Sequence, residues 1–293
     1  SPPPTAKRCA MAAMDTSEPQ PTNPNAHLER LFPVPGEGYT WGPPEEPTYP
    51  VPEWDAFKTK VVGGHSRNVN KLAWNASGDK LASGSDDRTC RVWSGEDDYR
   101  HSLKLDGHGD SVVQLAWDPR NNESLATLAA DKTVRLWDVS ALKETRVFYG
   151  HSGSVTSLAY SAHGNLIISG SKDNSVRFWD IISGLLVNSI DNVGEVTSLD
   201  LSSNGYHMLT ASKGNSNRLW DLRKMSGGGS GGGQHKAVRL YKGNQNSFTN
   251  FIRVSLGPHP SLVMSGSEDG YCYLWDRQSG SCVQRLGGFN SII

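Results

Sequence analysis

The chain has 293 residues, a formal net charge of −1 and 20% charged residues. This length suffices for one large all-β domain with a tail. The near-zero charge excludes the basic surface of a dedicated nucleic-acid binder, so no sequence-specific nucleic-acid contact is expected. No apolar run approaches the length of a membrane span. We therefore expect a soluble nuclear or cytoplasmic protein without a membrane partner.

The four cysteines do not indicate a metal centre. Cys9, Cys90, Cys272 and Cys282 form neither a CxxC pair nor a zinc-ligand spacing. Reduced thiols are the expected state in a nuclear or cytosolic protein. The sequence predicts no metal and no cofactor.

Residues 1–56 differ in composition from the rest of the chain. Thirteen of the sixteen prolines lie between Pro2 and Pro52, without apolar periodicity around them. Such a segment buries too little surface to offset chain entropy, which predicts disorder or polyproline II. Residues 39–54 add two Trp and two Tyr. They are either a solvated leader or a docking segment, for a partner or for the rest of the chain.

One sequence pattern recurs five times over residues 57–288. Each copy has a tryptophan, at successive spacings of 44, 42, 41 and 55, and four of the five are followed directly by Asp. In order they are Trp93, Trp137, Trp179, Trp220 and Trp275. A repeat of this period with a Trp-Asp pair is typical of a propeller blade.

Each copy predicts four strands in a fixed order. It begins with Gly-His or a relic of it, such as Gly107-His108. An alternating run follows, for example Val69–Trp74 or Val155–Tyr160, and predicts an inner strand that buries every second side chain. A strand that ends in small residues, a turn with Asp and a strand that ends in Trp come next. A fourth, outer strand leads into the next Gly-His.

Polar residues keep fixed places in this pattern. An Asp stands six residues before the Trp, a hydroxyl four residues earlier, and a His begins repeats one to three. We expect a buried hydrogen-bonded network, because each unpaired buried group costs about 1–3 kcal/mol. Its predicted members are His65, Ser83, Asp87 and Trp93; His108, Thr127, Asp131 and Trp137; His151, Ser169, Asp173 and Trp179; and Ser265, Asp269 and Trp275.

The same His, Ser and Asp types also occur in hydrolase triads. A nucleophile occurs once in an enzyme, whereas this set recurs from copy to copy. Ser85 and Ser171 lie in Ser-Gly-Ser turns and not in a Gly-x-Ser-x-Gly elbow. We therefore expect an architectural role and no enzyme.

The fourth repeat departs from the pattern at two places. Gly214 replaces the Asp and no His precedes it, so its network is expected to be incomplete and its blade the softest, by about 1–3 kcal/mol. A Gly/Ser-rich stretch at 226–233 precedes the predicted outer strand Lys236–Tyr241. No Gly-Lys-Ser/Thr or helix follows this stretch, so we interpret it as a flexible loop insertion and not as a phosphate loop.

Together these motifs resemble WD40-repeat proteins, which implies an all-β WD40 β-propeller with five recognisable four-stranded blades. Phe57–Val62 is similar to the outer strand that completes a last blade, yet the fifth repeat already has its own outer strand at Ser281–Leu286. WD40 rings commonly have seven blades. We expect an incomplete or open ring of that type, followed by a tail at 289–293; a compact five-bladed ring is the alternative.

Repeats one and two also resemble the WD-repeat subunits of the THO mRNA-export complex. The resemblance covers His65–Trp93, Gly107–Trp117 and Asp131–Val139, and is weak beyond residue 139. It implies a nuclear role in mRNA processing or export.

The WD40 resemblance further implies that partners bind the top loops around the central channel. The candidate positions flank the start of each inner strand or precede the turn Asp, and their mixed chemistry favours a protein or peptide partner. Phe251 and Arg253 are the strongest candidates, because aromatic and Arg side chains dominate interface energies. The full set is Asn68, Asn70, Asp86, Ser111, Val113, Ala130, Ser154, Thr156, Lys172, Glu195, Thr197, Lys213, Phe251, Arg253 and Glu268.

The expected function is a non-catalytic scaffold for protein–protein interactions in a multiprotein complex, THO-like in nuclear mRNA processing or export. The alternative is a substrate receptor of a cullin-4 ubiquitin ligase, because Trp220–Arg223 resembles the WDxR box. Gly214 and Asn217 depart from that box. An enzyme is a third option, but no non-repeating cluster of catalytic groups supports it.

Overall fold

The computed structural model describes residues 62–191, 193–225, 236–244, 246, 252–257 and 261–287. The chain divides into two units, Ser1–Lys60 and Val61–Ile293. Outside the described residues lie the whole Pro-rich segment, nearly all of the predicted strand Phe57–Val62, the insertion 226–233, Phe251 and the tail 289–293. Among the residues described, no helix has the length and apolar character needed to cross a membrane.

The described part of the chain forms five four-stranded antiparallel sheets, which confirms the predicted fold class. Each sheet uses four consecutive strands, and each is one blade. Blades one and two comprise β1 Val69–Trp74, β2 Lys80–Ser85, β3 Thr89–Ser94, β4 Ser102–Asp106, β5 Val112–Trp117, β6 Ser124–Ala129, β7 Val134–Asp138 and β8 Lys143–Phe148. Blades three and four comprise β9 Val155–Tyr160, β10 Leu166–Ser171, β11 Val176–Asp180, β12 Leu186–Ile190, β13 Val196–Leu201, β14 His207–Ser212, β15 Ser216–Asp221 and β16 Arg239–Tyr241. Blade five comprises β17 Val254–Leu256, β18 Leu262–Ser265, β19 Cys272–Asp276 and β20 Cys282–Leu286, and short 3-10 helices cover Gly95–Asp97 (η2) and Leu222–Met225 (η3).

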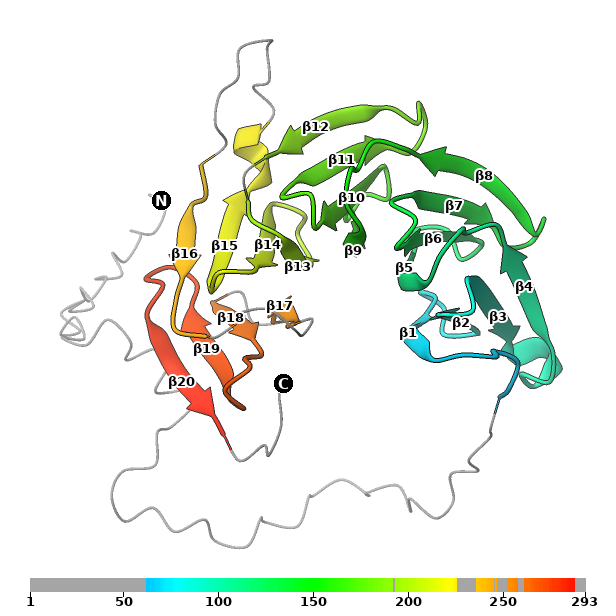
Figure 1. The fold of residues 1–293 in the computed structure, drawn as a ribbon, viewed down its shortest axis with the longest axis horizontal. Coiled ribbons are helices and arrows are strands. Elements are labelled where there is room, and N and C mark those ends of the chain that lie inside the picture. Colours follow the sequence, from blue (N-terminus) through cyan, green and yellow to red (C-terminus); the bar gives the residue numbers. More distant parts are fainter. Residues whose placement is uncertain are drawn as a thin grey trace, which may run out of the picture. The chain divides into compact units, whose positions relative to one another are not determined.

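The blades follow one another in chain order as an arc (Figure 1). The inner strands β1, β5, β9, β13 and β17 each pack beside the next one. In the part of the chain that the structure describes, the arc does not close into a ring, as the strand count predicted.

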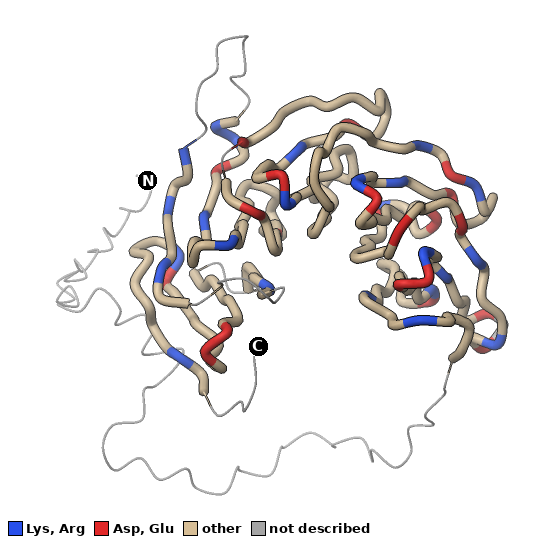
Figure 2. The backbone as a smooth tube through the Cα atoms, in the orientation of Figure 1, with Lys and Arg blue, Asp and Glu red and all other residues tan. Residues whose placement is uncertain are grey.

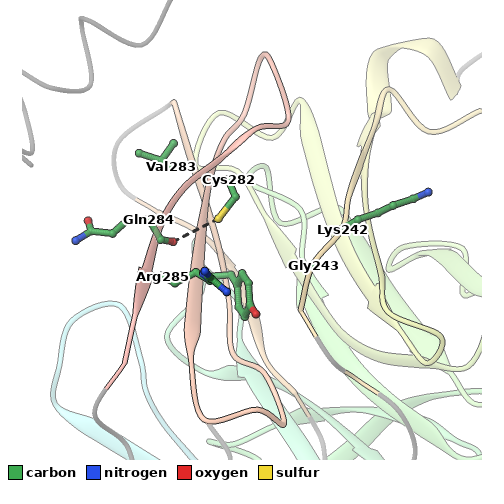
Figure 3. A pocket seen from close by; sticks show the side chains of 7 residues that line it. Lys242, Gly243, Cys282, Val283, Gln284 and Arg285 are labelled. Carbon is green, nitrogen blue, oxygen red and sulfur yellow. Dashed lines mark hydrogen bonds between the residues drawn. The ribbon is translucent and has the colours of Figure 1, made fainter.

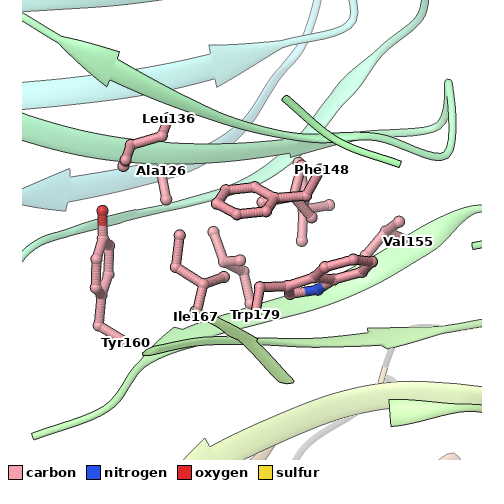
Figure 4. Close-up of a cluster of buried hydrophobic side chains, with 10 residues drawn as sticks. Ala126, Leu136, Phe148, Val155, Tyr160, Ile167 and Trp179 are labelled. Carbon is pink, nitrogen blue, oxygen red and sulfur yellow. The ribbon is translucent and has the colours of Figure 1, made fainter. Parts of the chain in front are cut away.

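The core lies between blades and not within them. Ala126, Leu136 and Phe148 of blade two pack against Val155 and Trp179 of blade three, all at most 6% exposed (Figure 4). Each such buried large side chain contributes about 1.5–3 kcal/mol. Along each strand of a blade, side chains that pack against the preceding blade therefore alternate with side chains that pack against the next blade.

Small residues at the end of the second strand of a blade allow neighbouring blades to approach closely. A Cβ added to Gly170 in β10 would lie 2.5 Å from Val196 Cγ1 of the following blade. The same addition to Gly84 in β2 would lie 2.7 Å from Val112 Cγ1. The Ser-Gly-Ser segments are thus required by packing between blades.

In blade three the predicted polar residues form one hydrogen-bonded chain. Trp179 Nε1 donates to Ser169 Oγ at 2.8 Å, and Ser169 Oγ lies 2.8 Å from His151 Nε2. His151 Nδ1 lies 2.8 Å from Asp173 Oδ2. Because a carboxylate only accepts, Nδ1 carries the proton, and Nε2 of the neutral ring accepts from the serine hydroxyl. The hydroxyl proton of Ser169 and both ring nitrogens of His151 are therefore engaged in these hydrogen bonds.

The carboxylate of Asp173 is the end point of the chain. It also accepts hydrogen bonds from Ser152 N at 3.0 Å and from Ser175 N and Oγ at 3.0 and 2.6 Å. Burial alone would raise the pKa of Asp173, but the hydrogen bonds from Ser175 and His151 lower it to about 2. Burial lowers the pKa of His151 below its ordinary 6.5. Both shifts keep the network in its neutral-imidazole, ionised-carboxylate form at pH 7.

Blades one and two repeat these contacts. His65 bridges Ser83 (2.6 Å) and Asp87 (2.8 Å). His108 bridges Thr127 (2.8 Å) and Asp131 (2.9 Å). The indole of Trp137 donates to the Thr127 hydroxyl at 2.7 Å, and the ring of Trp93 meets His65 edge-on.

In blade four the network has neither His nor Asp, and an asparagine of the following loop takes part of their place. Trp220 Nε1 still donates to Thr210 Oγ1 at 2.9 Å. The fully buried Asn246 donates through N to Asn215 Oδ1, and its carbonyl accepts from Gly214 N. Asn246 Oδ1 has no hydrogen-bond partner among the described residues, so the replacement is partial.

In blade five the structure does not join Ser265, Asp269 and Trp275, and the prediction of a common network there was wrong. Asn244 stands in place of the His and donates to Ser265 Oγ at 3.4 Å. Asp269 accepts from Tyr273 Oη at 2.6 Å, and Trp275 Nε1 donates to a main-chain carbonyl, that of Lys242. The Asn244 side chain is shorter than a His and does not bond to Asp269, so Tyr273 supplies the hydrogen bond to that carboxylate.

Ser169→Ala should destabilise the protein by about 1–3 kcal/mol for each group that it leaves unpaired, Trp179 Nε1 and His151 Nε2. Chemical denaturation measures this change. Ser203→Ala, which removes an exposed hydroxyl, should stay within about 0.5 kcal/mol. Equal effects of the two substitutions would contradict the network.

The free energy of unfolding should fall in two steps on acidification. A lowered His pKa contributes stability above 6.5 that is lost as pH falls through the folded value, and Asp173 contributes stability above 3.8 that is lost on approach to pH 2. Urea titrations at pH 8 to 5 should show less slope in His151→Gln than in the parent, by at most about 1.4 kcal/mol per pH unit. His163→Gln, at an exposed histidine of the same blade, should keep the parental slope.

Candidate protein-interaction face

The loops that carry the predicted contact residues are fixed to each other by main-chain hydrogen bonds. In blade one Asp86 N donates to Asn68 O at 3.0 Å, and in blade three Lys172 N donates to Ser154 O at 2.9 Å. Ala130 to Ser111 and Lys213 to Glu195 repeat the bond at 2.9 Å. Two of the three predicted positions thus lie side by side in each of the first four blades.

Side chains at this face differ in their availability. Asn68, Asn70 and Lys172 are exposed, whereas Ser111 and Val113 are half-buried. Asn70 Nδ2 donates to Asp86 Oδ1 at 2.7 Å and to Val112 O at 3.0 Å. The first of these bonds lowers the pKa of Asp86, so an oriented carboxylate is present at neutral pH.

Two predicted contact residues are buried between blades and not available to a partner. Thr156 is 3% exposed, and its hydroxyl lies 2.6 Å from Val196 O and 3.1 Å from Gly170 O. Thr197 is 4% exposed and accepts from Asn246 Nδ2 at 3.1 Å. The Thr156 hydroxyl thus bonds to the main chain of the next blade and the Thr197 hydroxyl to the Asn246 side chain, which removes both threonines from the candidate surface.

Arg253 lies one position further along its strand than predicted. Val254 pairs with Ser265 as Leu72 pairs with Ser83 and Leu115 with Thr127. Arg253 therefore corresponds to Lys71 and Gln114, and Ile252 corresponds to Asn70. The sequence pattern alone did not show this register.

The corrected register places Arg253 among groups of several blades. Its Nη1 donates to Gln114 Oε1 of blade two at 3.4 Å. Burial lowers the pKa of Lys71, and the positive charge of Arg253 lowers it further, against the opposite effect of Asp200. Lys71, Gln114 and Asp200 thus join Arg253 as candidate site residues that the sequence interpretation missed.

The remaining predicted positions carry both signs of charge. Lys213 Nζ lies 2.7 Å from Glu195 Oε2 across the two loops of blade four, and Glu268 is half-buried in blade five. Over the blades, basic and acidic residues alternate without a continuous one-signed stripe (Figure 2). A mixed surface of this kind suits protein partners better than a polyanion.

The described residues contain no group of three or more His, Cys, Asp or Glu that could hold a metal ion. A hollow of about 450 Å³ in blade five is lined by Lys242, Gly243, Tyr273 and residues 282–285 (Figure 3). Its acidic neighbour Asp269 is bonded to Tyr273, and burial raises the pKa of the Cys282 thiol, so neither group is activated.

Comparison with known proteins agrees with this architecture. The family model "WD domain, G-beta repeat" matches residues 57–94, 100–138, 142–180, 186–221 and 236–276. The chain belongs to the WD40-repeat family.

Several WD40 relatives resemble about half of the chain. THO complex subunit 3 of Arabidopsis thaliana is 38% identical over 141 residues, which are 47% of this chain and 43% of that protein. Nuclear distribution protein nudF of Aspergillus oryzae is 33% identical over 126 residues (42% and 27%). B-type cell cycle switch protein ccs52B of Medicago truncatula is 34% identical over 144 residues (47% and 29%). The chain therefore spans less than half the length of each of these relatives.

The Trp220–Arg223 segment of this WD40 chain has a defined geometry. Arg223 donates through Nε and Nη2 to both carboxylate oxygens of Asp221 at 3.0 Å, and its guanidinium lies 5.0 Å from the centre of the Tyr206 ring. The Arg223 side chain is nevertheless 57% exposed. It is oriented by its own blade and accessible to a partner.

Thr156→Val should destabilise the WD40 domain although it preserves size, because it removes the single hydroxyl proton that lies between two main-chain carbonyls. The expected cost is about 0.5–1.5 kcal/mol. Ser152→Ala, at an exposed hydroxyl of the same blade, should be neutral within about 0.5 kcal/mol. Thermal and urea denaturation distinguish the two, and a neutral Thr156→Val would show that this hydroxyl does not stabilise the contact between blades.

Proposed function

We propose that this chain is a non-catalytic WD40 scaffold that binds protein or peptide segments on the top face of its blades. The observation that supports this most is the pairing of the two top loops in each of blades one to four by a main-chain bond. Loops fixed in this way present their side chains at little entropic cost to binding. Asn70, Asp86, Lys172 and Arg253 supply the polar contacts that give specificity.

We further propose membership of a THO-like complex in nuclear mRNA processing or export. The support is the likeness to THO complex subunit 3, which is 38% identical over 141 residues, together with the matching motifs of repeats one and two. Its localisation would then be nuclear. The other WD40 relatives share the repeat and support the scaffold role alone.

Affinity purification of the full chain from nuclear extract, followed by mass spectrometry, should recover other THO-complex subunits. The double variant Lys172→Glu/Arg253→Glu should reduce this recovery about fivefold or more, since loss of 1 kcal/mol at an interface costs about that factor. His163→Glu also introduces a carboxylate, at the opposite end of blade three in the loop between β9 and β10, and should leave the recovery unchanged.

Two outcomes separate the levels of this proposal. Recovery of unrelated partners that still depends on Lys172 and Arg253 would remove the THO assignment and keep the top-face scaffold. Recovery that is equal for the double variant and the His163→Glu control would remove the top face as the binding site.

A cullin-4 substrate receptor is the second candidate, and the geometry of Arg223 supports it. The side chain is exposed yet held by Asp221 and Tyr206, which is a suitable arrangement for a contact with a ligase adaptor. Arg223→Ala should then abolish adaptor binding while Arg146→Ala, at another exposed arginine, does not. Unchanged adaptor binding by Arg223→Ala would eliminate this function.

A further inference from the structure

Blade one exposes an apolar face that every other blade covers. Val69, Leu72 and Trp74 of β1 are 48%, 55% and 52% exposed. Their counterparts in β5, by the same strand register, are Val112, Leu115 and Trp117, at 0%, 2% and 7%. In blade two this face packs against blade one, so the exposed residues are one half of an inter-blade contact whose other half is absent from the described residues.

Blade five exposes the complementary half. Leu286 pairs with Cys272 as Leu105 pairs with Cys90 in blade one. Leu105 is 2% exposed because it packs against the next blade, whereas Leu286 is 42% exposed. Met264 and Cys272 on the same face are also only half-buried.

The contact between blades one and two shows how these halves fit together. There, Ala82, Cys90 and Leu105 of blade one pack against Leu115 and Trp117 of blade two. At the matching positions of blade five stand Met264, Cys272 and Leu286, all apolar. On blade one, Leu72 and Trp74 occupy the positions that Leu115 and Trp117 occupy on blade two.

The polar position beside this contact is also compatible. Blade five carries Arg253 where blade one carries Lys71. Blade one packs on blade two with that lysine in place, so a cation at the inner strand does not prevent the contact. The same arrangement therefore serves for blade five against a following blade.

We propose that the blade-five face of one copy of this chain packs on the blade-one face of a second copy. The contact repeats between molecules what four neighbouring blade pairs form within one. It is heterologous, because each copy contributes a different face. Contiguous exposed apolar surface of this kind marks an association site.

The experiment measures the molar mass of the full chain by sedimentation velocity and light scattering over about a 100-fold range of concentration. The parent should associate as concentration rises. Leu72→Glu blocks the blade-one face and Leu286→Glu blocks the blade-five face. Each substitution should weaken association about tenfold or more, so each variant should stay monomeric where the parent associates.

A mixture of the two variants gives the decisive test. Leu72→Glu retains a competent blade-five face and Leu286→Glu a competent blade-one face, so an equimolar mixture should form a 1:1 dimer and nothing larger. Leu142→Glu, at a 49% exposed leucine away from both faces, should associate like the parent. Circular dichroism verifies the fold of each variant, and Trp74→Glu and Leu286→Lys repeat each block with a second substitution.

Three outcomes would overturn the proposal. A parent chain that stays monomeric at all concentrations leaves the faces without a second copy as occupant. Persistent dimers of Leu286→Glu alone would indicate a contact between two blade-one faces. A mixture of the two variants that stays monomeric would show that the two faces do not pair.

Discussion

The structure depends on the need of every blade for an apolar neighbour on each side. Phe148 and Leu136 of blade two face Val155 and Trp179 of blade three, and neither set is covered by its own four strands. An isolated sheet would leave both faces in water, and each large side chain would lose about 1.5–3 kcal/mol of burial. This requirement explains the close approach at Gly170, the arc of successive blades, and the exposed Leu72 and Leu286 at its two ends.

The polar network supplies hydrogen-bond partners for the turns and loop ends that are buried beside that core. In blade three, Asp173 accepts four hydrogen bonds, and the chain through His151 and Ser169 ends at the Trp179 indole. Every donor is used within the blade, so this set has no free nucleophile or base. The set therefore resembles a hydrolase triad in its residue types, but its hydrogen bonds hold the parts of one blade together.

The proposed function rests on the way these two features fix the loops of the top face. The network anchors the loop before the inner strand to the turn with Asp, and the main-chain bond from Lys172 to Ser154 fixes the same loops at the face. A face built in this way offers fixed side chains to a partner. In the proposed function, residues such as Asp86, Lys172 and Arg253 decide which partner binds, because they vary from blade to blade although the frame does not.

The sequence alone determined the fold, the blade boundaries and the networks of blades one to three, because period, Gly-His, Asp and Trp recur at fixed spacing. It did not determine the roles of Thr156 and Arg253, or the bonds of Trp275. Those depend on contacts between blades and on strand register, which no pattern within one repeat encodes. Tertiary packing alone decided which hydroxyls are buried and which apolar faces remain uncovered, since burial depends on the neighbouring blade.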